Sequence, residues 1–223
     1  YDGIISELLD NDFNPGKDFS CSPDFRDFKL LDEFREHNKK ILVTCSDYNE
    51  PSRARYSKGG GGLYLYDLVS GISEKKVSGS FRQIVIKDDN YYVVDYVACE
   101  VLVLSKKYEI INRFQLDAPN YCGIAYNKNK NIFILINTGK DTISIHSGDN
   151  FELLDRVHYS AQKELEGISE HHLNDVFCEG NEIYVTYFSH SGNWKKGIFD
   201  GGVSKINVND LSKPPTVMVQ GLW

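Results

Sequence analysis

Three stretches of this chain can be aligned with one another, and this internal repeat constrains the fold more than any single motif. Each stretch is a short apolar strand, a polar turn rich in Asn, Asp, Lys or Gly, and a second strand of β-branched and aromatic residues. The three stretches are residues 82–94, 122–135 and 174–185. A third strand follows each of them, at residues 101–104, 142–145 and 203–206, and a fourth closes each unit.

A unit of about 40 to 50 residues built from four strands is typical of a β-propeller blade. We therefore predict an all-β fold, a β-propeller of four-stranded antiparallel blades, with about four blades in residues 40–223. An open stack of sheets leaves strand edges exposed, which proteins normally avoid by closure. The chain also starts without Met. Both features favour a truncated or partial view of a larger propeller, closed by further chain or by oligomerisation.

Residues 1–39 do not follow the repeat. Apolar residues recur there at helical spacing on both sides of an Asn14-Pro15-Gly16 turn, which predicts two short helices. This segment is interpreted as a helical cap on the propeller or as a linker to another domain.

Composition excludes some classes of partner. The chain has 25 Lys and Arg against 32 Asp and Glu, a net charge of -7, and no basic stripe with interleaved aromatic residues. Such a surface repels phosphate backbones, so nucleic acid is not an expected partner. No apolar run approaches the roughly 20 residues that a membrane helix requires, so a membrane is not expected either. The odd set of cysteines contains no CxxC pair and favours buried thiols in a reducing cytoplasm; it comprises Cys21, Cys45, Cys99, Cys122 and Cys178.

The densest polar cluster of the chain is the stretch of residues 171–175, directly before an apolar strand. In a propeller, the residues that precede the innermost strand of each blade converge on one axial site. The repeat places the pairs Phe81-Arg82 and Tyr121-Cys122 at equivalent positions. The predicted ligand-binding ring at the mouth of the channel comprises Arg82, Tyr121, His172, Asn174 and Asp175.

Two chemistries fit this ring. The oxygens of Asn174 and Asp175 suit a hard cation such as Ca²⁺. The imidazole of His172, beside a carboxylate, could serve as an oriented catalytic base. The alternative is structural, because an Asn-Asp pair before a strand is also an ordinary turn that hydrogen-bonds its own backbone.

A second candidate is the glycine-punctuated loop of residues 189–197, which carries Trp194 between His190 and two lysines. An exposed Trp beside hydrogen-bonding side chains is what a sugar-stacking surface requires. Alternatively, Trp194 folds back and fills the space under its own loop.

One part of the chain resembles an uncharacterised bacterial β-propeller family whose members often accompany glycosyltransferases. The resemblance is carried by residues 171–176 and 183–189, then Gly192, Trp194, residues 196–197 and residues 200–203. Residues 41–46 and 61–68 are similar to its opening blade, and the resemblance covers residues 40–223. It implies a role in bacterial surface-carbohydrate metabolism, with a glycosyltransferase as a partner. That family has no settled activity.

A weaker resemblance is to calcium-dependent propellers of the gluconolactonase and regucalcin type, whose strands are preceded by Asn-Asp or Asn-Gly metal ligands. Only Asn174 and Asp175 match that pattern, and Arg82 and Tyr121 do not supply the remaining ligands.

Three hypotheses for the function follow. The leading one is an accessory propeller that recognises a glycan, a nucleotide-sugar or another small polar ligand. The second is a metal-assisted hydrolase or lactonase with Asn174 and Asp175 as ligands and His172 as base. The third is a protein-interaction scaffold. The sequence leaves open whether the chain is an enzyme.

Overall fold

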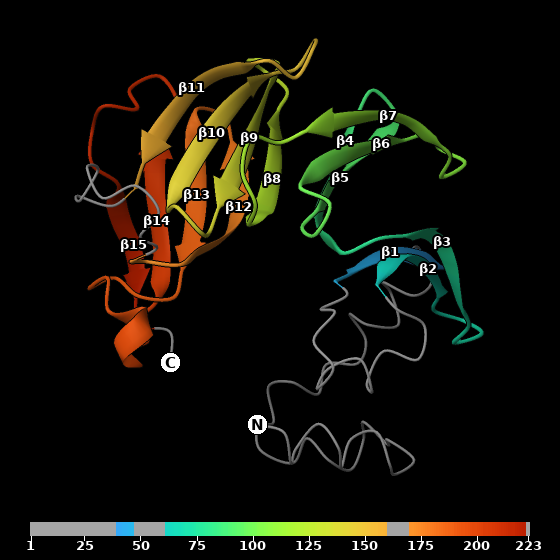
Figure 1. Cartoon of the computed structure of the whole chain (residues 1–223), viewed down its shortest axis with the longest axis horizontal. Helices are drawn as coiled ribbons and strands as arrows, with labels where there is room; N and C mark the ends of the chain where they lie inside the picture. Colours follow the sequence, from blue (N-terminus) through green and yellow to red (C-terminus); the bar gives the residue numbers. More distant parts are fainter. Residues whose placement is uncertain (1–38, 47–60, 160–169, 222–223) are drawn as a thin grey trace. The chain divides into compact units, whose positions relative to one another are not determined.

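The computed structural model describes residues 39–46, 61–159 and 170–221 (Figure 1). The chain divides into two compact units. The smaller comprises Tyr1–Ile41 and Tyr66–Ile72, and the larger comprises Leu42–Leu65 and Ser73–Trp223. The predicted helices in residues 1–39 lie outside the described residues, apart from Lys39, and stay a prediction.

The described strands form four antiparallel sheets, and each sheet covers a continuous range of the colour gradient in Figure 1, because its strands are consecutive in the sequence. The first sheet has the order β1-β2-β3, with strands Lys40–Cys45, Gly62–Asp67 and Ser73–Ser78. The second is β4-β5-β6-β7, with strands Phe81–Lys87, Asn90–Asp95, Glu100–Leu104 and Ile110–Gln115. The third is β8-β9-β10-β11, with strands Tyr121–Asn127, Ile132–Asn137, Thr142–Ser147 and Leu153–His158. The fourth is β12-β13-β14-β15, with strands Leu173–Glu179, Glu182–Tyr187, Gly202–Asn207 and Thr216–Gln220.

The predicted all-β architecture of antiparallel blades is therefore confirmed, with four strands in the second, third and fourth sheets. The first sheet has three strands among the described residues. Residues 47–60, between β1 and β2, lie outside the described part of the chain. A single turn of 3-10 helix, η2 (Trp194–Lys196), is the one helical element in the segments that the structure describes.

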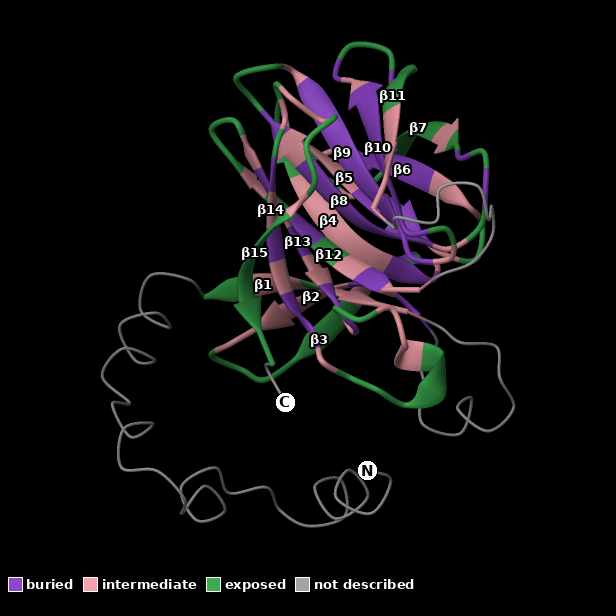
Figure 2. Cartoon of the chain, turned by 90° about the vertical axis from the view of Figure 1, so that its left-hand side faces the viewer, coloured by how far each residue is buried: buried purple, intermediate pink, exposed green. Residues whose placement is uncertain are grey.

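Strand β9 shows why the middle of the third sheet reads as a continuous apolar run. Successive side chains of a strand point to opposite faces. Phe133 and Leu135 belong to the core shared with the second sheet, whereas Ile134 and Ile136 belong to the core shared with the fourth. Both faces of β9 are therefore covered, and all of its residues are buried (purple in Figure 2). The outermost strand β15 is exposed along its whole length.

Strand β8 lies between two neighbours, with contacts to β4 on one side and to β12 on the other. Its residues divide accordingly. Ile124 joins the core between the second and third sheets, and Ala125 joins the core between the third and fourth sheets. A separate core between the first and second sheets contains Leu63, Val77 and Val93. The first strands β4, β8 and β12 of successive blades are thus brought side by side.

The first strands β4, β8 and β12 share an irregularity. In β4, Phe81 pairs with Asp95 and Ile84 with Val93, so three steps on β4 match two on β5. One residue too many also appears in β8, between Tyr121 and Gly123, and in β12, between Leu173 and Val176. Each first strand therefore carries a β-bulge at the equivalent position.

His146 of β10 is a buried polar residue within the third sheet. Its Nδ1 lies 3.0 Å from the carbonyl oxygen of Phe151, and the two rings lie 4.8 Å apart. Burial lowers the pKa of His146 below its ordinary value of 6.5, because the charged imidazolium would lose its hydration.

We expect this histidine to make the protein less stable in mild acid. Since the pKa of His146 is lower in the folded than in the unfolded chain, the unfolded chain binds more protons as the pH falls below 6.5. The free energy of unfolding should therefore fall with decreasing pH, by at most about 1.4 kcal/mol per pH unit for this group. Urea unfolding between pH 7.5 and 5 measures the slope. His146→Phe should flatten it, and an unchanged slope in that variant would contradict the assignment.

Candidate functional site

A polar pocket of about 350 Å³ lies at the bulges of the first strands. Its lining residues come from four sheets: Thr44, Ser46, Phe81, Arg82, Gln83, Cys122, Asn174 and Asp175. Thr44 belongs to β1, and Ser46 is the residue directly after β1. The others belong to β4, β8 and β12, so a single pocket collects side chains that are up to about 130 residues apart in the sequence.

The bulges explain why these residues and not their neighbours line the pocket. The residues between the register positions of each bulge are Arg82 and Gln83 in β4, Cys122 in β8, and Asn174 and Asp175 in β12. All five line the pocket. An extra residue bends the strand and re-aims its side chains, and β-bulges are common next to functional sites for this reason.

Arg82 and Asp175 give the pocket one charge of each sign. The guanidinium carbon of Arg82 lies 4.7 Å from the centre of the Tyr96 ring, a cation–π contact that fixes its position. Although Asp175 is exposed as a whole residue, loss of hydration around its carboxylate raises its pKa above the ordinary value, and the positive charge of Arg82 offsets part of that rise. Both side chains keep contact with solvent, since Asp175 is exposed and Arg82 is half-buried.

Cys122 is the buried floor of the pocket. Its thiol donates a hydrogen bond to the carbonyl oxygen of Asn174, at 2.8 Å. Burial raises the pKa of Cys122 to about 12, the negative charge of Asp175 acts in the same direction, and Arg82 opposes it. The thiol therefore stays protonated at neutral pH and is a structural donor rather than a nucleophile.

The entry to β12 is held by the carboxylate of Asp141, which lies in the turn directly before strand β10. Asp141 is fully buried. Its Oδ2 accepts hydrogen bonds from the backbone N–H groups of Glu170 and His171, and its Oδ1 accepts one from Leu173 at 3.3 Å. Asp141 therefore fixes the stretch that leads into Asn174 and Asp175.

Tyr121 does not line the pocket. The register makes Tyr121 the equivalent of Phe81 and Leu173, the residues that precede each bulge. Its ring is buried, and its hydroxyl lies 3.0 Å from Asp117 Oδ1 and 3.0 Å from Ser144 Oγ, within the third blade. The structure places Cys122, rather than Tyr121, at the position equivalent to Arg82.

His172 and Trp194 lie together, and neither is a lining residue of the polar pocket. Their ring centres are 4.4 Å apart, and the His172 ring also stacks on Phe188 at 4.6 Å. Burial lowers the pKa of His172, and the charges of Arg82 and Lys195 lower it further, while Asp141 opposes this. These three aromatic residues, His172, Phe188 and Trp194, are called the aromatic cluster below.

Hydrogen bonds to Asp200 hold the ends of the loop that carries Trp194. The Ser189 hydroxyl donates a hydrogen bond to Asp200 Oδ1, at 2.7 Å, and the Ser191 N–H donates to Asp200 Oδ2, at 3.1 Å. Burial raises the pKa of Asp200, but the hydrogen bonds from Ser189 and Ser191 together outweigh it, so this pKa lies below its ordinary value. Trp194 itself is half-buried, so part of its surface stays accessible.

Five lining residues were not singled out as ligand-binding from the sequence: Thr44, Ser46, Phe81, Gln83 and Cys122. The repeat itself held a signal for two of them. Gln83 and Cys122 stand within the aligned stretches, where Cys122 takes the same position as Arg82 and Gln83 directly follows Arg82. Thr44 and Ser46 carry no such signal, because β1 lies outside the aligned repeat.

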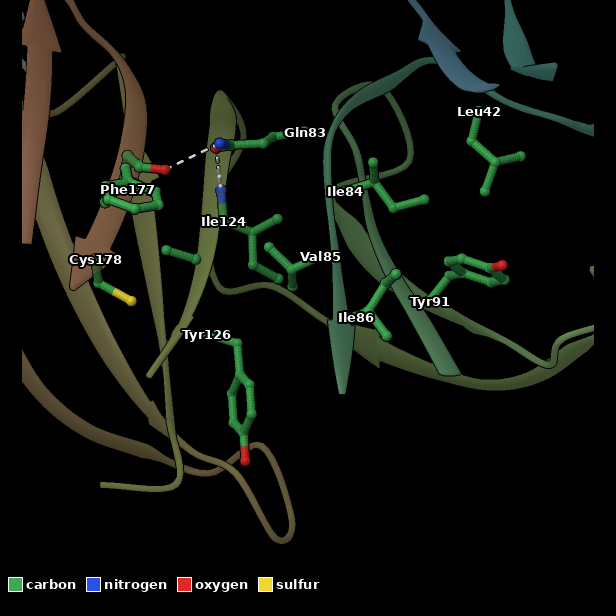
Figure 3. Close-up of a pocket in the computed structure, with 12 residues that line it drawn as sticks. Leu42, Gln83, Ile84, Val85, Ile86, Tyr91, Ile124, Tyr126, Phe177 and Cys178 are labelled. Carbon is green, nitrogen blue, oxygen red and sulfur yellow. Dashed lines mark hydrogen bonds between the residues drawn. The ribbon is translucent and has the colours of Figure 1, made fainter. Parts of the chain in front are cut away.

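Gln83 divides the space between the first strands into two pockets. Its Nε2 donates to the carbonyl oxygen of Val176, at 2.9 Å, and its Oε1 accepts from the N–H of Ile124, at 2.8 Å. Figure 3 shows both bonds as dashed lines. A Cβ atom on Gly123 would lie 3.2 Å from Gln83 Oε1, so glycine gives this bridge its room.

Beyond Gln83 lies an apolar pocket of about 470 Å³. Its lining residues are shown in Figure 3: Leu42, Gln83, Ile84, Val85, Ile86, Tyr91, Ile124, Ala125, Tyr126, Val176, Phe177 and Cys178. Phe177 and Ile86 are 61% and 62% exposed. The described lining residues offer few polar groups and no charged side chain, so they have little with which to orient a polar ligand.

We expect Gln83→Glu to lower the free energy of unfolding by about 2 kcal/mol, because a carboxylate cannot donate to Val176 and a half-buried carbonyl loses its partner. Thermal unfolding measures the effect. Gln115→Glu is the matched control, since Gln115 donates the same kind of bond to Cys99, at 2.8 Å, on the surface. It should change stability by no more than about 0.5 kcal/mol. Equal losses in the two variants would contradict the bridging role of Gln83.

The predicted Ca²⁺ site stays a prediction. Asn174 and Asp175 both line the polar pocket, and their oxygens are of the type that Ca²⁺ prefers. Within residues 39–46, 61–159 and 170–221, no three His, Cys, Asp or Glu side chains are grouped so that they could share a metal ion.

The same described segments contain no helix with the length and apolar character to cross a membrane.

Comparison with known proteins gives the fold and no closer identity. No family model matches the sequence, and no curated protein matches it. The resemblance to the uncharacterised propeller family therefore gains no support from sequence comparison.

Several solved structures are similar to this chain. A protein of unknown function from Bacteroides caccae matches with a TM-score of 0.50 and 15% identity, over 80% of this chain and 66% of that one. Kuenenia stuttgartiensis hydrazine synthase matches with a TM-score of 0.50 and 11% identity, over 71% of this chain and 42% of the synthase. Myxococcus xanthus glutaminyl cyclase gives a TM-score of 0.46 at 14% identity, over 66% and 57% of the two chains.

The matches span between about two fifths and two thirds of these proteins' own lengths. At sequence identities this low, the matches are evidence for the fold alone. Together with the repeated antiparallel sheets, they show that this chain is a β-propeller-like protein.

Proposed function

We propose that the chain is an accessory binding propeller whose polar pocket recognises a small polar ligand, a sugar or the sugar part of a glycan or nucleotide-sugar. One observation carries the proposal. The same bulge recurs in the first strands of three blades. The bulged residues Arg82, Asn174 and Asp175 line one pocket, together with Thr44 and Ser46. Guanidinium, amide, carboxylate and hydroxyl groups are the donors and acceptors that bind hydroxylated ligands.

The size of the pocket narrows the ligand. At about 350 Å³ it lies near the lower end of the roughly 300–1,000 Å³ range of small-molecule sites. This space suits one sugar residue better than a whole nucleotide-sugar. We therefore propose that the nucleotide, or the rest of a glycan, lies outside the pocket.

The aromatic cluster supports the same proposal. Trp194 keeps part of its surface accessible, and its ring partner His172 directly precedes strand β12, two residues before the lining residue Asn174. A ring face next to a polar pocket is a surface on which a sugar can stack. Contact of Trp194 with the ligand is a proposal that the mutagenesis below tests.

The metal-assisted hydrolase and the interaction scaffold stay hypotheses, and no contact in the described segments favours either over the binder. The same holds for Ca²⁺ and for a glycosyltransferase partner. A cytoplasmic location is proposed on the chemistry of the thiols, because Cys45, Cys99, Cys122 and Cys178 are all free.

Thermal unfolding with millimolar sugars tests the binding function. A ligand that binds only the folded chain raises stability by RT ln(1 + [L]/Kd), about 2.7 kcal/mol at a hundredfold excess over Kd. We expect stabilisation by a monosaccharide, with no further gain from its nucleotide derivative. Asn174→Ala should abolish it, and Trp194→Ala should weaken it.

Asn112→Ala is the matched control for Asn174→Ala, because Asn112 is an exposed residue of β7 outside the pocket. It should leave the stabilisation unchanged. A stabilisation that needs Ca²⁺ would favour the hydrolase, and no stabilisation by any sugar would contradict the binding function.

A further inference from the structure

We propose that the open face of the fourth sheet binds a second copy of this chain. The open face is the side of β12, β13 and β14 that points away from the third sheet. Its residues are Phe177, Glu182, Tyr184, Thr186, Val203 and Lys205. They alternate along β12 and β13 with Val176, Ile183 and Val185, which are buried in the core shared with the third sheet. This interface is independent of the ligand proposed for the polar pocket.

The other blades show which residues occupy the same positions in their packed cores. By the register of the second and third strands, Lys205 is equivalent to Ile145 of the third blade and to Val103 of the second. Thr186 is likewise equivalent to Ile136. The three apolar residues, Ile145, Val103 and Ile136, are 5%, 4% and 0% exposed. Lys205 and Thr186 are half-buried. Two core positions of the blade are therefore polar on the open face.

The ammonium group of Lys205 decides how this face can be covered. A further blade packed as the second and third blades are would take that ammonium out of water, which is strongly destabilising without an ion-pair partner. Among the described residues Lys205 has no such partner. Interfaces between separately folded chains are more polar than a domain core. Of the two expected means of covering an open blade, the residues of this face therefore favour oligomerisation.

The open face also keeps an apolar centre. Phe177 is 61% exposed, and its ring centre lies 6.1 Å from that of Tyr184. Val203, on the next strand, adds a third apolar side chain. Aromatic side chains are enriched in protein–protein interfaces, where polar groups surround them. The open face thus has the composition of an interface.

The charges of the open face favour a second copy as the partner. In a two-fold symmetric dimer each surface binds itself, so it has to carry a charge together with its counter-charge. Lys205 of β14 is paired with Tyr184 of β13, and Glu182 lies two residues before Tyr184 on the same face. When β14 of one copy lies across β13 of the other, Lys205 meets Glu182 of the second copy. Packed sheets lie about 10 Å apart, and these two long side chains together span that distance. The symmetry forms the same ion pair twice.

Sedimentation velocity over a range of chain concentrations tests the interface. One face of a single sheet is small, so we expect a reversible dimer with a Kd in the micromolar range, and a monomer in dilute solution. Lys205→Glu and Glu182→Lys should each weaken the dimer at least about tenfold, because each places like charges opposite one another twice. Lys128→Glu is the matched control, since Lys128 is exposed in the turn after β8. It makes the same change of charge and should leave the dimer unchanged.

An equal mixture of Lys205→Glu and Glu182→Lys gives a second readout. In their heterodimer one copy carries acidic groups at both positions and the other carries basic groups at both. Both ion pairs can therefore form again, and the mixture should dimerise although neither variant does so alone. A structural role of either residue within its own chain would not be rescued by mixing.

Three results would overturn the inference. They are a parent chain that stays monomeric at every concentration, a dimer that Lys205→Glu leaves intact, and a mixture that stays monomeric while both variants are folded by circular dichroism. If a charge variant fails to fold, Tyr184→Ala takes its place and should weaken the dimer at least about tenfold through lost aromatic contact. An unchanged dimer in that variant would equally overturn the inference.

Discussion

Phe133→Ala is expected to lower the free energy of unfolding by about 4 kcal/mol, the largest effect of any single change considered. Phe133 is 1% exposed and lies at the centre of the core between the second and third sheets. Its ring centre is 4.5 Å from that of Tyr92, 5.0 Å from Tyr126 and 5.2 Å from Phe151. Truncation removes these contacts and leaves a cavity, because two packed sheets cannot collapse into it.

Urea unfolding of Phe133→Ala measures this loss, and Phe177→Ala is its matched control. Phe177 has the same side chain, but it is 61% exposed and its ring centre is 6.1 Å from that of Tyr184. We expect Phe177→Ala to cost no more than about 0.5 kcal/mol. Similar losses in the two variants would show that the second and third sheets do not share the core described here.

Asp141→Ala is expected to cost about 3 kcal/mol, because three backbone N–H groups lose a buried charged acceptor. Part of this loss has another cause, since Asp141 has a φ of 48°, a left-handed conformation that Ala adopts less easily than Asp. Hydrogen exchange gives a second readout. The amides of His171 and Leu173 should exchange faster, as the entry to β12 is released.

Asp89→Ala separates the two causes. Asp89 has a φ of 64° and lies in the exposed turn between β4 and β5, where its carboxylate pairs with Lys106 at 2.9 Å. Asp89→Ala introduces the same backbone strain but removes no buried hydrogen bond. We therefore expect it to lower the free energy of unfolding by about 1 kcal/mol. If Asp141→Ala costs no more than Asp89→Ala, the anchoring role of Asp141 is wrong.

Asp141→Ala and Phe133→Ala should also differ in their effect on ligand binding to the polar pocket. Asp141 holds the stretch that precedes Asn174 and Asp175, although it lies directly before β10 and not in the pocket lining. Ligand binding to Asp141→Ala should therefore weaken even where the protein stays folded, whereas Phe133→Ala should leave binding unchanged in the folded fraction.

The sequence was sufficient for the blade architecture because hairpins are local. The strand pairs β4-β5, β8-β9 and β12-β13 are each joined by a short polar turn, and their side chains alternate with a period of two. Those two signals recur three times in the chain, so strands, turns and antiparallel pairing could all be predicted. The same repeat placed Arg82, Asn174 and Asp175 at equivalent ends of first strands, and all three line one pocket.

What only the tertiary structure decided is which side chain at each strand end faces the pocket. A single extra residue in a strand moves the following side chains to the other face. The bulge of β8 therefore brings Cys122 into the pocket and leaves Tyr121 in the core. The bridge of Gln83 to Ile124 and Val176 likewise spans three sheets. No local pattern encodes such a bond, because its partners lie 41 and 93 residues away and meet only when the sheets pack.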